Sequence, residues 1–460
     1  MENFWDYSVW GFVNLTASML ISLLAANLLK KSFRWLRVSL IPTSVLGGLL
    51  LLAVSLTYQA VTGNNFFNAN AFGGSGAATL EIVTYHCLAL GFIATTMKPD
   101  GGKLTRERQV EIFNTGLTTV ATYLLQAVLG FGITIIAAKV IDGFFAAAGV
   151  LLPFGYGQGT GQALNYGGIY ENDFGFVGGK SFGLTVACMG FLSASLGGVA
   201  HLYILKKKGH ILDRGRGDSS LDMGEVQGEG EIPMQESMDK ITVQLAFIAL
   251  AYFIAQLMMI ILGNLIPGMK SVIYGFNFLL GVAAATLVKL VLNFLNRHGL
   301  VRRKHTNDFL MTRCSNFFYD LMVVAGVAAI RLGILESYWG IMLVLGVVGL
   351  VVTYVYNLFV AKRLFPAYPQ EQFLMMYGML TGTASTGVIL LREIDGDFKT
   401  PAADNMVYQN LPAIALGFPM MLLATLAPVK PVLTMVILVV FFLVLQVVLF
   451  RSFLFRRRKK

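Results

Sequence analysis

The stretch "GYGQGTGQALNYGG", Gly155 to Gly168, decides the fold because it lies between two of the most apolar segments of the chain. Glycine is a poor helix former, and a broken helix exposes backbone groups that lipid cannot satisfy. Non-helical backbone is tolerated at membrane depth only where protein buries it or where it lines a watery cavity. If the surrounding chain spans a membrane, the stretch therefore predicts a binding site.

The composition is that of an all-α polytopic membrane protein. The chain has 460 residues, of which 56% are hydrophobic and 13% charged, with a mean hydropathy of +0.67. Soluble domains carry about 25% charged residues, and a transmembrane helix needs roughly 20 apolar residues, whereas a β-barrel would show shorter alternating segments. We expect spans near residues 8–29, 40–60, 79–97, 109–139, 178–205, 240–265, 271–296, 315–334, 338–361, 403–427 and 431–453.

The basic residues indicate orientation and do not indicate a nucleic-acid partner. Although the net charge is +10, Lys and Arg fall in short clusters at the ends of apolar segments, as the positive-inside rule requires. All six clusters lie in the cytoplasm if the N-terminus is outside and the C-terminus inside. The start "MENFWDYSVW" lacks a basic region, so we expect no cleavable signal peptide. The expected location is a bacterial plasma (inner) membrane.

Two halves of the chain repeat one pattern of five spans. Residues 1–208 contain the first glycine-rich segment, near 143–170, and residues 240–428 contain a counterpart near 371–392, "GMLTGTASTG" at Gly378 to Gly387. Residues 209–239 are rich in glycine and acidic residues and predict a flexible cytoplasmic linker. Residues 429–460 add an extra C-terminal span and a basic tail. Because five is odd, the second repeat enters the membrane inverted, which is typical of secondary transporters with two re-entrant segments.

The two segments offer groups that suit a sodium ion bound beside a small anion. Glycine exposes backbone amides and carbonyls, threonine, serine and amide side chains add oxygen atoms, and helix N-termini attract anions. The competing explanation is close helix packing, for which small residues suffice. The candidate site residues are Gly157, Gln158, Gly159, Thr160, Gly161, Asn165, Thr381, Gly382, Thr383, Ser385 and Thr386.

Other polar residues have weaker claims. Arg331 and Arg392 are possible contacts for a substrate carboxylate, or they are interfacial arginines that reach toward the lipid headgroups. Asp320 is an ionisable residue inside a predicted span, which makes it a candidate for function. Asn114 and Gln126 either face the first segment or bond to a neighbouring helix. "GGKS" at Gly178 to Ser181 lacks the first glycine of a phosphate-binding loop, and no His/Cys spacing indicates another metal.

With these motifs the chain resembles the bacterial sodium/glutamate symporter family. The strongest match is "GQGTG", Gly157 to Gly161, followed by "YENDFGF"; "LTGTASTG" at Leu380 to Gly387 is looser, and Arg331 ends a span where that family tends to have a basic residue. The resemblance implies sodium-driven glutamate uptake by a homodimer whose moving part carries both re-entrant tips. The chain differs from the family in Gln158, the long linker and the extra final span.

We therefore expect a sodium-coupled symporter of a small amino acid or carboxylate, with glutamate as the first candidate, without a cofactor and without enzymatic activity. One alternative is a proton-linked antiporter or exporter, which would require intramembrane carboxylates. Another is a non-transporting membrane sensor or scaffold that uses the linker as its signalling surface. Sodium-dependent binding of a solute separates the first interpretation from the other two.

Overall fold

Every regular element of the computed structural model is a helix. The structure describes residues 3–98, 105–209, 231–232, 234, 237–300, 303–396 and 399–454, and within these ranges β-pairing is confined to one isolated bridge between Glu231 and Lys304. The prediction of an all-helical chain is therefore confirmed. The α-helices are α1 (Tyr7–Ser32), α2 (Arg34–Val38), α3 (Thr43–Thr62), α4 (Gly76–Thr96), α5 (Arg106–Val140), α6 (Leu151–Tyr156), α7 (Gly159–Phe174), α8 (Gly179–Lys207), α10 (Lys240–Leu265), α11 (Lys270–Gly275), α12 (Asn277–Arg297), α13 (Asp308–Ala328), α14 (Trp339–Leu364), α15 (Pro369–Thr381), α16 (Ala384–Arg392), α17 (Ala402–Tyr408), α18 (Asn410–Leu426), α19 (Pro431–Leu449) and α20 (Arg451–Leu454).

Short 3-10 helices connect several of these elements. They occupy η1 (Phe66–Asn68), η2 (Asn70–Phe72), η3 (Ala146–Val150), η4 (Pro267–Met269) and η5 (Leu332–Tyr338). A 3-10 turn has poorer hydrogen-bond geometry than an α-helix and is used in short pieces. Each of them lies in a connection between two longer helices.

Nine of the described helices are long and apolar enough to cross a membrane, and a tenth span results if the bent pair α17 and α18 counts as one. The chain is thus a multi-pass membrane protein. The predicted span near 315–334 has no counterpart in this set. Its residues belong mainly to α13, which ends at Ala328 and is not among these spans. Arg313, Asn316 and Asp320 make α13 more polar than its neighbours.

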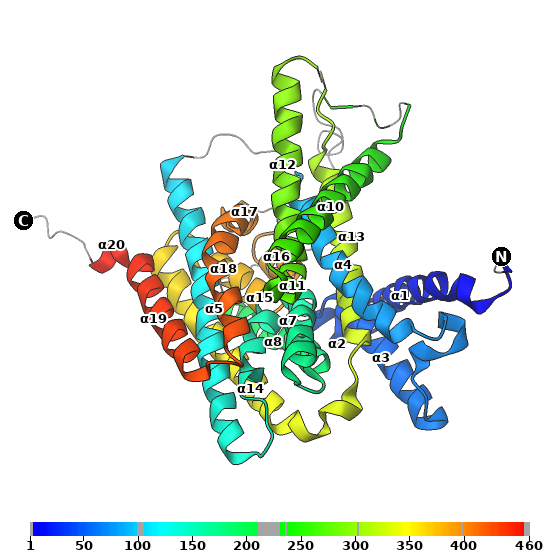
Figure 1. Ribbon diagram of the computed structural model, residues 1–460. Helices are drawn as coiled ribbons and strands as arrows, with labels where there is room; N and C mark the ends of the chain where they lie inside the picture. The colour runs from blue at the N-terminus through cyan, green and yellow to red at the C-terminus, as the bar shows by residue number, and fades with distance from the viewer. Residues whose placement is uncertain are drawn as a thin grey trace, which may run out of the picture.

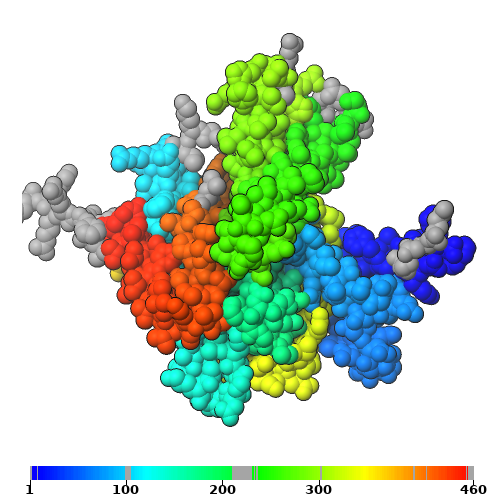
Figure 2. Space-filling view, viewed as in Figure 1, coloured from blue at the N-terminus to red at the C-terminus, as the bar shows by residue number. Residues whose placement is uncertain are grey.

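Helix α13 lies inside the helical assembly, against α4 and α3. Figure 1 shows α1 and α3 on one side of the molecule and α19 and α5 on the other, with α7, α8 and α15 between them. In the space-filling view the N-terminal residues and the C-terminal residues likewise lie at opposite sides (Figure 2). The two glycine-rich segments therefore lie in the middle of the helical assembly.

Large apolar side chains remain exposed along the outer helices. They include Leu24 on α1, Phe253 on α10, Val347 on α14 and Val440 on α19, each at least half exposed. In a soluble protein such continuous apolar surface would be unusual, whereas lipid solvates it at no cost. The outer helices are therefore the lipid-facing ones.

The described end of the predicted linker is docked onto the protein. The ammonium of Lys240, the first residue of α10, is fully buried and lies 2.7 Å from Oε2 of Glu231. The Asn307 side chain donates to the same carboxylate oxygen at 2.7 Å, and the Ile232 N–H donates to the Lys304 carbonyl at 3.1 Å. Glu231 and Ile232 thereby contact the connection between α12 and α13. Residues 210–230 of the predicted linker lie outside the described residues.

Candidate functional site

The first glycine-rich segment, which its glycine content predicts to be non-helical, is helical at all but two of its fourteen residues, and these two residues form a break between two helices. Helix α6 ends at Tyr156, α7 begins at Gly159, and Gly157 and Gln158 lie between them. Gly159 has a φ of +77°, a conformation that costs an L-residue about 1–2 kcal/mol and that glycine adopts freely. Because Gln158 is half-buried and every other residue from 151 to 170 is buried, the break lies inside the protein and not at its surface.

Helix α5 holds this break from one side. The hydroxyl of Tyr123 donates to the Gly157 carbonyl at 3.0 Å. A Cβ atom at position 157 would overlap the Tyr123 ring, so the backbone can approach the ring only because residue 157 is glycine. Gly157 therefore has a packing role that the sequence pattern did not reveal.

The second glycine-rich segment is also a break between helices. Helix α15 ends at Thr381, Gly382 and Thr383 form the break, and α16 begins at Ala384. The hydroxyls of Thr383 and Thr386 lie 3.3 Å apart. Thr381 and Gly382 are buried, whereas Ala384 is exposed and Ser385 is half-buried. One side of this break therefore faces open space.

The two breaks lie against each other. A methyl carbon built on Gly159 would sit 3.6 Å from Cγ2 of Thr383 and 3.7 Å from the Gly382 carbonyl oxygen. These are ordinary van der Waals separations for the added atom, so the start of α7 lies within about one methyl group of the connection between α15 and α16. The structure thus brings together Gly159, Gly382 and Thr383 of the predicted set.

Buried amide atoms without partners gather on the first break. The Nε2 atom of Gln158 and both side-chain polar atoms of Gln162 are buried, and none of them has a hydrogen-bond partner among the described residues. Gln162 is only 1% exposed. Residues four apart share one face of a helix, so the two amides are spaced to act together. A buried polar group without a partner costs about 1–3 kcal/mol, which is why such groups point to a ligand.

Other predicted site residues on α7 contact neighbouring helices instead. The Thr160 hydroxyl donates to the Met322 carbonyl of α13 at 3.4 Å, Gly161 packs on Leu88 of α4, and the Asn165 amide donates to the Gly275 carbonyl at 3.1 Å. The hydroxyl of Thr381 donates to the Tyr377 carbonyl of its own helix at 2.6 Å. In this conformation these groups fix the helices that carry the two breaks.

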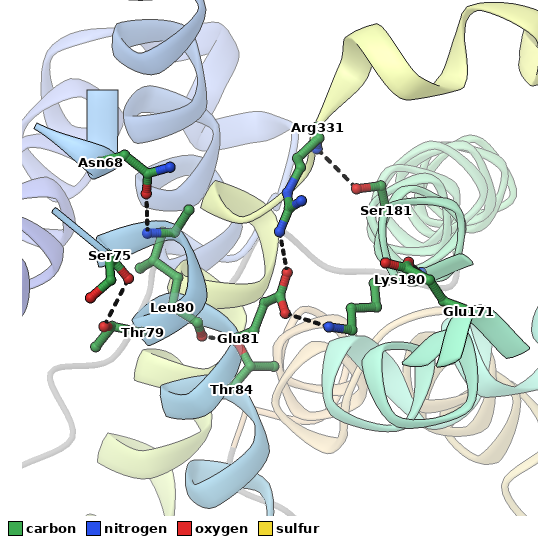
Figure 3. A network of polar contacts seen from close by, with 11 residues as sticks. Asn68, Ser75, Thr79, Leu80, Glu81, Thr84, Glu171, Lys180, Ser181 and Arg331 are labelled. Atoms are coloured by element: carbon green, nitrogen blue, oxygen red, sulfur yellow. Dashed lines mark hydrogen bonds and ion pairs between the residues drawn. The ribbon is translucent and has the colours of Figure 1, made fainter. Parts of the chain in front are cut away.

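Arg331 belongs to a network of charges away from the breaks. Its guanidinium lies 2.8 Å from Oε1 of Glu81 on α4, and the Lys180 ammonium lies 2.8 Å from Oε2 of the same carboxylate. Figure 3 shows Glu81 between the two cations, with the Arg331 backbone N–H directed at Ser181. Lys180 also donates through its backbone N–H to Glu171, near the end of α7. That end is roughly 20 Å from Gly159 at 1.5 Å per residue.

The remaining charged candidates lie elsewhere as well. Asp320 is exposed on α13, with its carboxyl beside the Ser44 hydroxyl of α3. Arg392 is exposed at the end of α16, eight residues beyond the start of that helix. The described residues contain no cluster of three His, Cys, Asp or Glu side chains that could hold a metal ion.

Helix α5 bonds to the glycine-rich segments through two side chains, of which the sequence analysis named only one. Gln126 donates through Nε2 to the Leu380 carbonyl at 3.1 Å, while Tyr123, one turn earlier, holds Gly157. One turn of α5 thus bonds to both glycine-rich segments. Asn114, the other open candidate, accepts a hydrogen bond from Arg451 at 3.1 Å and faces the C-terminal helices. The signal for Tyr123 was its spacing of three residues from Gln126, which places both on one helix face.

Comparison of the sequence with models of known protein families and with curated proteins finds no match.

Proposed function

We propose that the chain is a sodium-coupled symporter of a small amino acid or carboxylate, with glutamate as the first substrate to test. The proposal includes a bacterial inner membrane and a homodimer, as the resemblance to sodium/glutamate symporters implies, and an external N-terminus with a cytoplasmic C-terminus, as the positive-inside rule indicates. The observation that carries it is the close approach of Gly159 to the Gly382–Thr383 connection, beside buried amide atoms that have no partner among the described residues.

Paired packing of equivalent helices supports the proposed inverted repeats. If the two halves are aligned in chain order, α1, α3, α5 and α8 correspond to α10, α12, α14 and α18. The contact of α1 with α3 then matches that of α10 with α12, and the contact of α8 with α14 matches that of α18 with α5. The helices that would be exchanged by a two-fold axis also contact each other, α4 with α13 and α5 with α14. Two re-entrant hairpins, α6 with α7 and α15 with α16, would then face each other across the axis. This is the arrangement in which many secondary transporters bind their cargo.

The polarity of the broken helices suits an anion and a cation together. Helices α7 and α16 begin at the breaks. The N-terminus of each helix, with its free N–H groups, carries the equivalent of about half a positive charge. Helices α6 and α15 end there, so their last carbonyls carry the opposite partial charge. A carboxylate would bind the former and sodium the latter. Each ligand would complete the other's site, which couples the two fluxes.

Uptake by purified protein in proteoliposomes tests this function. Labelled glutamate and other small amino acids and dicarboxylates should accumulate when sodium is outside and should not accumulate when choline replaces it. Thr383→Ala and Gln162→Leu should reduce uptake about tenfold or more, because each removes a polar group worth about 1–2 kcal/mol. Thr286→Ala on α12, whose hydroxyl bonds within its own helix, should leave uptake unchanged. Sodium-independent uptake of every solute tried would refute the proposal.

A further inference from the structure

The side-chain amide of Gln162 on α7 is buried, and its polar atoms have no partner among the described residues. The side chain is 1% exposed, and both Oε1 and Nε2 lack a hydrogen bond within the part of the chain that the structure describes. Because this holds for both atoms, either orientation of the amide presents an acceptor beside a donor. Most buried side-chain polar atoms are hydrogen-bonded in folded proteins. The amide therefore points to a ligand that offers a donor and an acceptor in return.

The side of α7 that carries Gln162 faces the second break and α18. Residues three and four apart lie on one side of a helix. Three residues before Gln162, Gly159 lies within about one methyl group of the connection at residues 382–383. Four residues after it, the Tyr166 hydroxyl donates to the Met421 carbonyl of α18 at 3.0 Å. Gln162 thus lies on the side of α7 where the two breaks approach each other.

Other sides of α7 are packed against neighbouring helices. Gly161 packs on Leu88 of α4, and the Thr160 hydroxyl donates to the backbone of α13 at 3.4 Å. A Cβ atom on Gly183 of α8 would overlap the Ala163 carbonyl oxygen. These contacts occupy the sides of α7 next to α4, α13 and α8. A solute would therefore approach Gln162 from the side of the second break.

The segments that border this side contain no charged residues. Residues 151–170, 372–391 and 410–426 include no Asp, Glu, Lys, Arg or His. The N-termini of α7 and α16 together supply the equivalent of about one positive charge, which one carboxylate of a solute neutralises. The second carboxylate of glutamate would find no ammonium or guanidinium on these segments, and an unpaired buried charge is costly. A carboxamide has nearly the same shape as a carboxylate and carries no charge.

We propose that Gln162 binds a side-chain carboxamide of the solute through two hydrogen bonds, one from Nε2 to the solute carbonyl and one from the solute NH2 group to Oε1. The inference rests on the proposed transport function and narrows its substrate to a neutral amino acid with a carboxamide side chain, glutamine or asparagine, in preference to glutamate. The solute's other carboxylate stays at the helix N-termini. Glutamate in this place would direct an acceptor at Oε1, and a site built for a donor rejects such an analogue.

Binding of three solutes to the purified full-length protein in sodium tests the inference. The solutes are L-glutamine, L-glutamate and the γ-methyl ester of L-glutamate, and the shift in melting temperature gives each half-saturating concentration. The wild type should bind glutamine about tenfold or more tightly than either analogue. Glutamate lacks the donor and adds a charge, whereas the ester is neutral and lacks only the donor. The ester therefore separates hydrogen bonding from charge in the wild type alone.

Gln162→Met removes both hydrogen-bonding atoms at nearly constant shape and should make the affinities for glutamine and the ester equal. A merely structural role of Gln162 would weaken the binding of all three solutes by one factor and keep their ratios, which would overturn the inference. Gln446→Met on α19 is the matched control. The Gln446 amide is half-buried and donates to the Tyr356 hydroxyl at 2.7 Å, so its loss should leave the ratios unchanged.

The outcomes separate this inference from the proposed function. Sodium-driven uptake of glutamate by a wild type that binds glutamine no more tightly than glutamate or the ester would overturn the inference and leave the transport function standing. Preferred binding of glutamine that is lost in Gln162→Met, without sodium-dependent uptake, would support the assignment of Gln162 and overturn the transport function. If none of the three solutes binds to the wild type, the inference is wrong.

Discussion

Gly159 and Thr383 lie close enough for one methyl group to bridge them although they belong to opposite halves of the chain: a methyl carbon on Gly159 would lie 3.6 Å from Cγ2 of Thr383. Each residue ends a break in a helix that lies inside the protein. A contact between two helix breaks is rare in a membrane protein unless it serves a purpose, because each break leaves backbone groups to be satisfied.

Gly159→Ala should reduce sodium-dependent uptake more than it reduces stability. The φ of +77° at Gly159 makes alanine cost about 1–2 kcal/mol, and the methyl group would fill the space between Gly159 and the second break. Gly175→Ala is the matched control, since Gly175 has a φ of +72° and nothing within 4 Å of the built methyl group. Thermal unfolding should show similar losses for both variants, and only Gly159→Ala should impair uptake. Equal uptake in the two variants would contradict a role for the contact.

Glu81→Gln should destabilise the protein by about 1–2 kcal/mol, because it removes the carboxylate shared by Lys180 and Arg331. Arg331 is 44% exposed, so most of the loss should come from Lys180. Thermal melting in detergent measures the effect, with Glu336→Gln, an exposed carboxylate on η5, as the control. Exchanging the charges in a Glu81→Lys/Lys180→Glu variant should restore part of the stability. A Glu81→Gln melting temperature equal to that of the control would argue against the network.

Glu231→Ala should cost about 3 kcal/mol or more, because it leaves the ammonium of Lys240 buried without its carboxylate. Lys240→Met should be costly for the same reason, since Glu231 then loses its cation. The double variant Glu231→Ala/Lys240→Met should lose less than the sum of the two single losses. Chemical denaturation of the three variants gives this coupling energy, and strictly additive losses would show that the pair is not coupled.

Asp395→Asn should weaken the connection between α16 and α17 at neutral pH. Burial alone would raise the pKa of the Asp395 carboxyl, but hydrogen bonds from Thr400 and Lys399 outweigh burial and lower this pKa below its usual value. A lowered folded-state pKa stabilises the fold above the unfolded pKa of about 3.9 and loses that contribution as the pH falls through the folded value. The difference in melting temperature between wild type and Asp395→Asn should therefore be largest near pH 7.

Below about pH 4 that difference should begin to shrink, because the carboxyl of the unfolded chain takes up a proton first, and it should vanish once the pH falls below the lowered pKa of the folded state. The control is Asp142→Asn, an exposed carboxyl in the connection between α5 and η3. A difference for Asp395→Asn that is constant from pH 7 to pH 3 would mean that the carboxyl does not carry the effect.

The helical class and the two breaks could be predicted from sequence, because apolar length and glycine content are local signals. Gly159 and Gly382 stood out since each interrupts an apolar stretch in the same position of its half. The partners of Glu81 were not predictable. Lys180 and Arg331 lie 99 and 250 residues away in the chain, and no local pattern links such distant residues. A carboxylate inside a predicted span was nevertheless a signal that could have been followed.

Side-chain direction is the other part that sequence could not supply. Thr160 and Asn165 have the right chemistry for ligands, but the rotation of α7 turns them toward α13 and the end of α11. The burial of Lys240 against Glu231 likewise depends on the fold around these two residues. Both outcomes follow from tertiary packing, which local composition does not encode.

The segments around the two breaks, residues 151–170 and 372–391, contain no Asp, Glu, Lys, Arg or His. Under the proposed function, these segments add no charge of their own to the cargo that they carry, so the charge that moves with them in the translocation step equals the summed valence of the bound ions and solute. One sodium with one monovalent anion would cross silently, and every additional sodium would register as one elementary charge. Electrical recording on solid-supported membranes would therefore read the stoichiometry directly from the sign and size of the current.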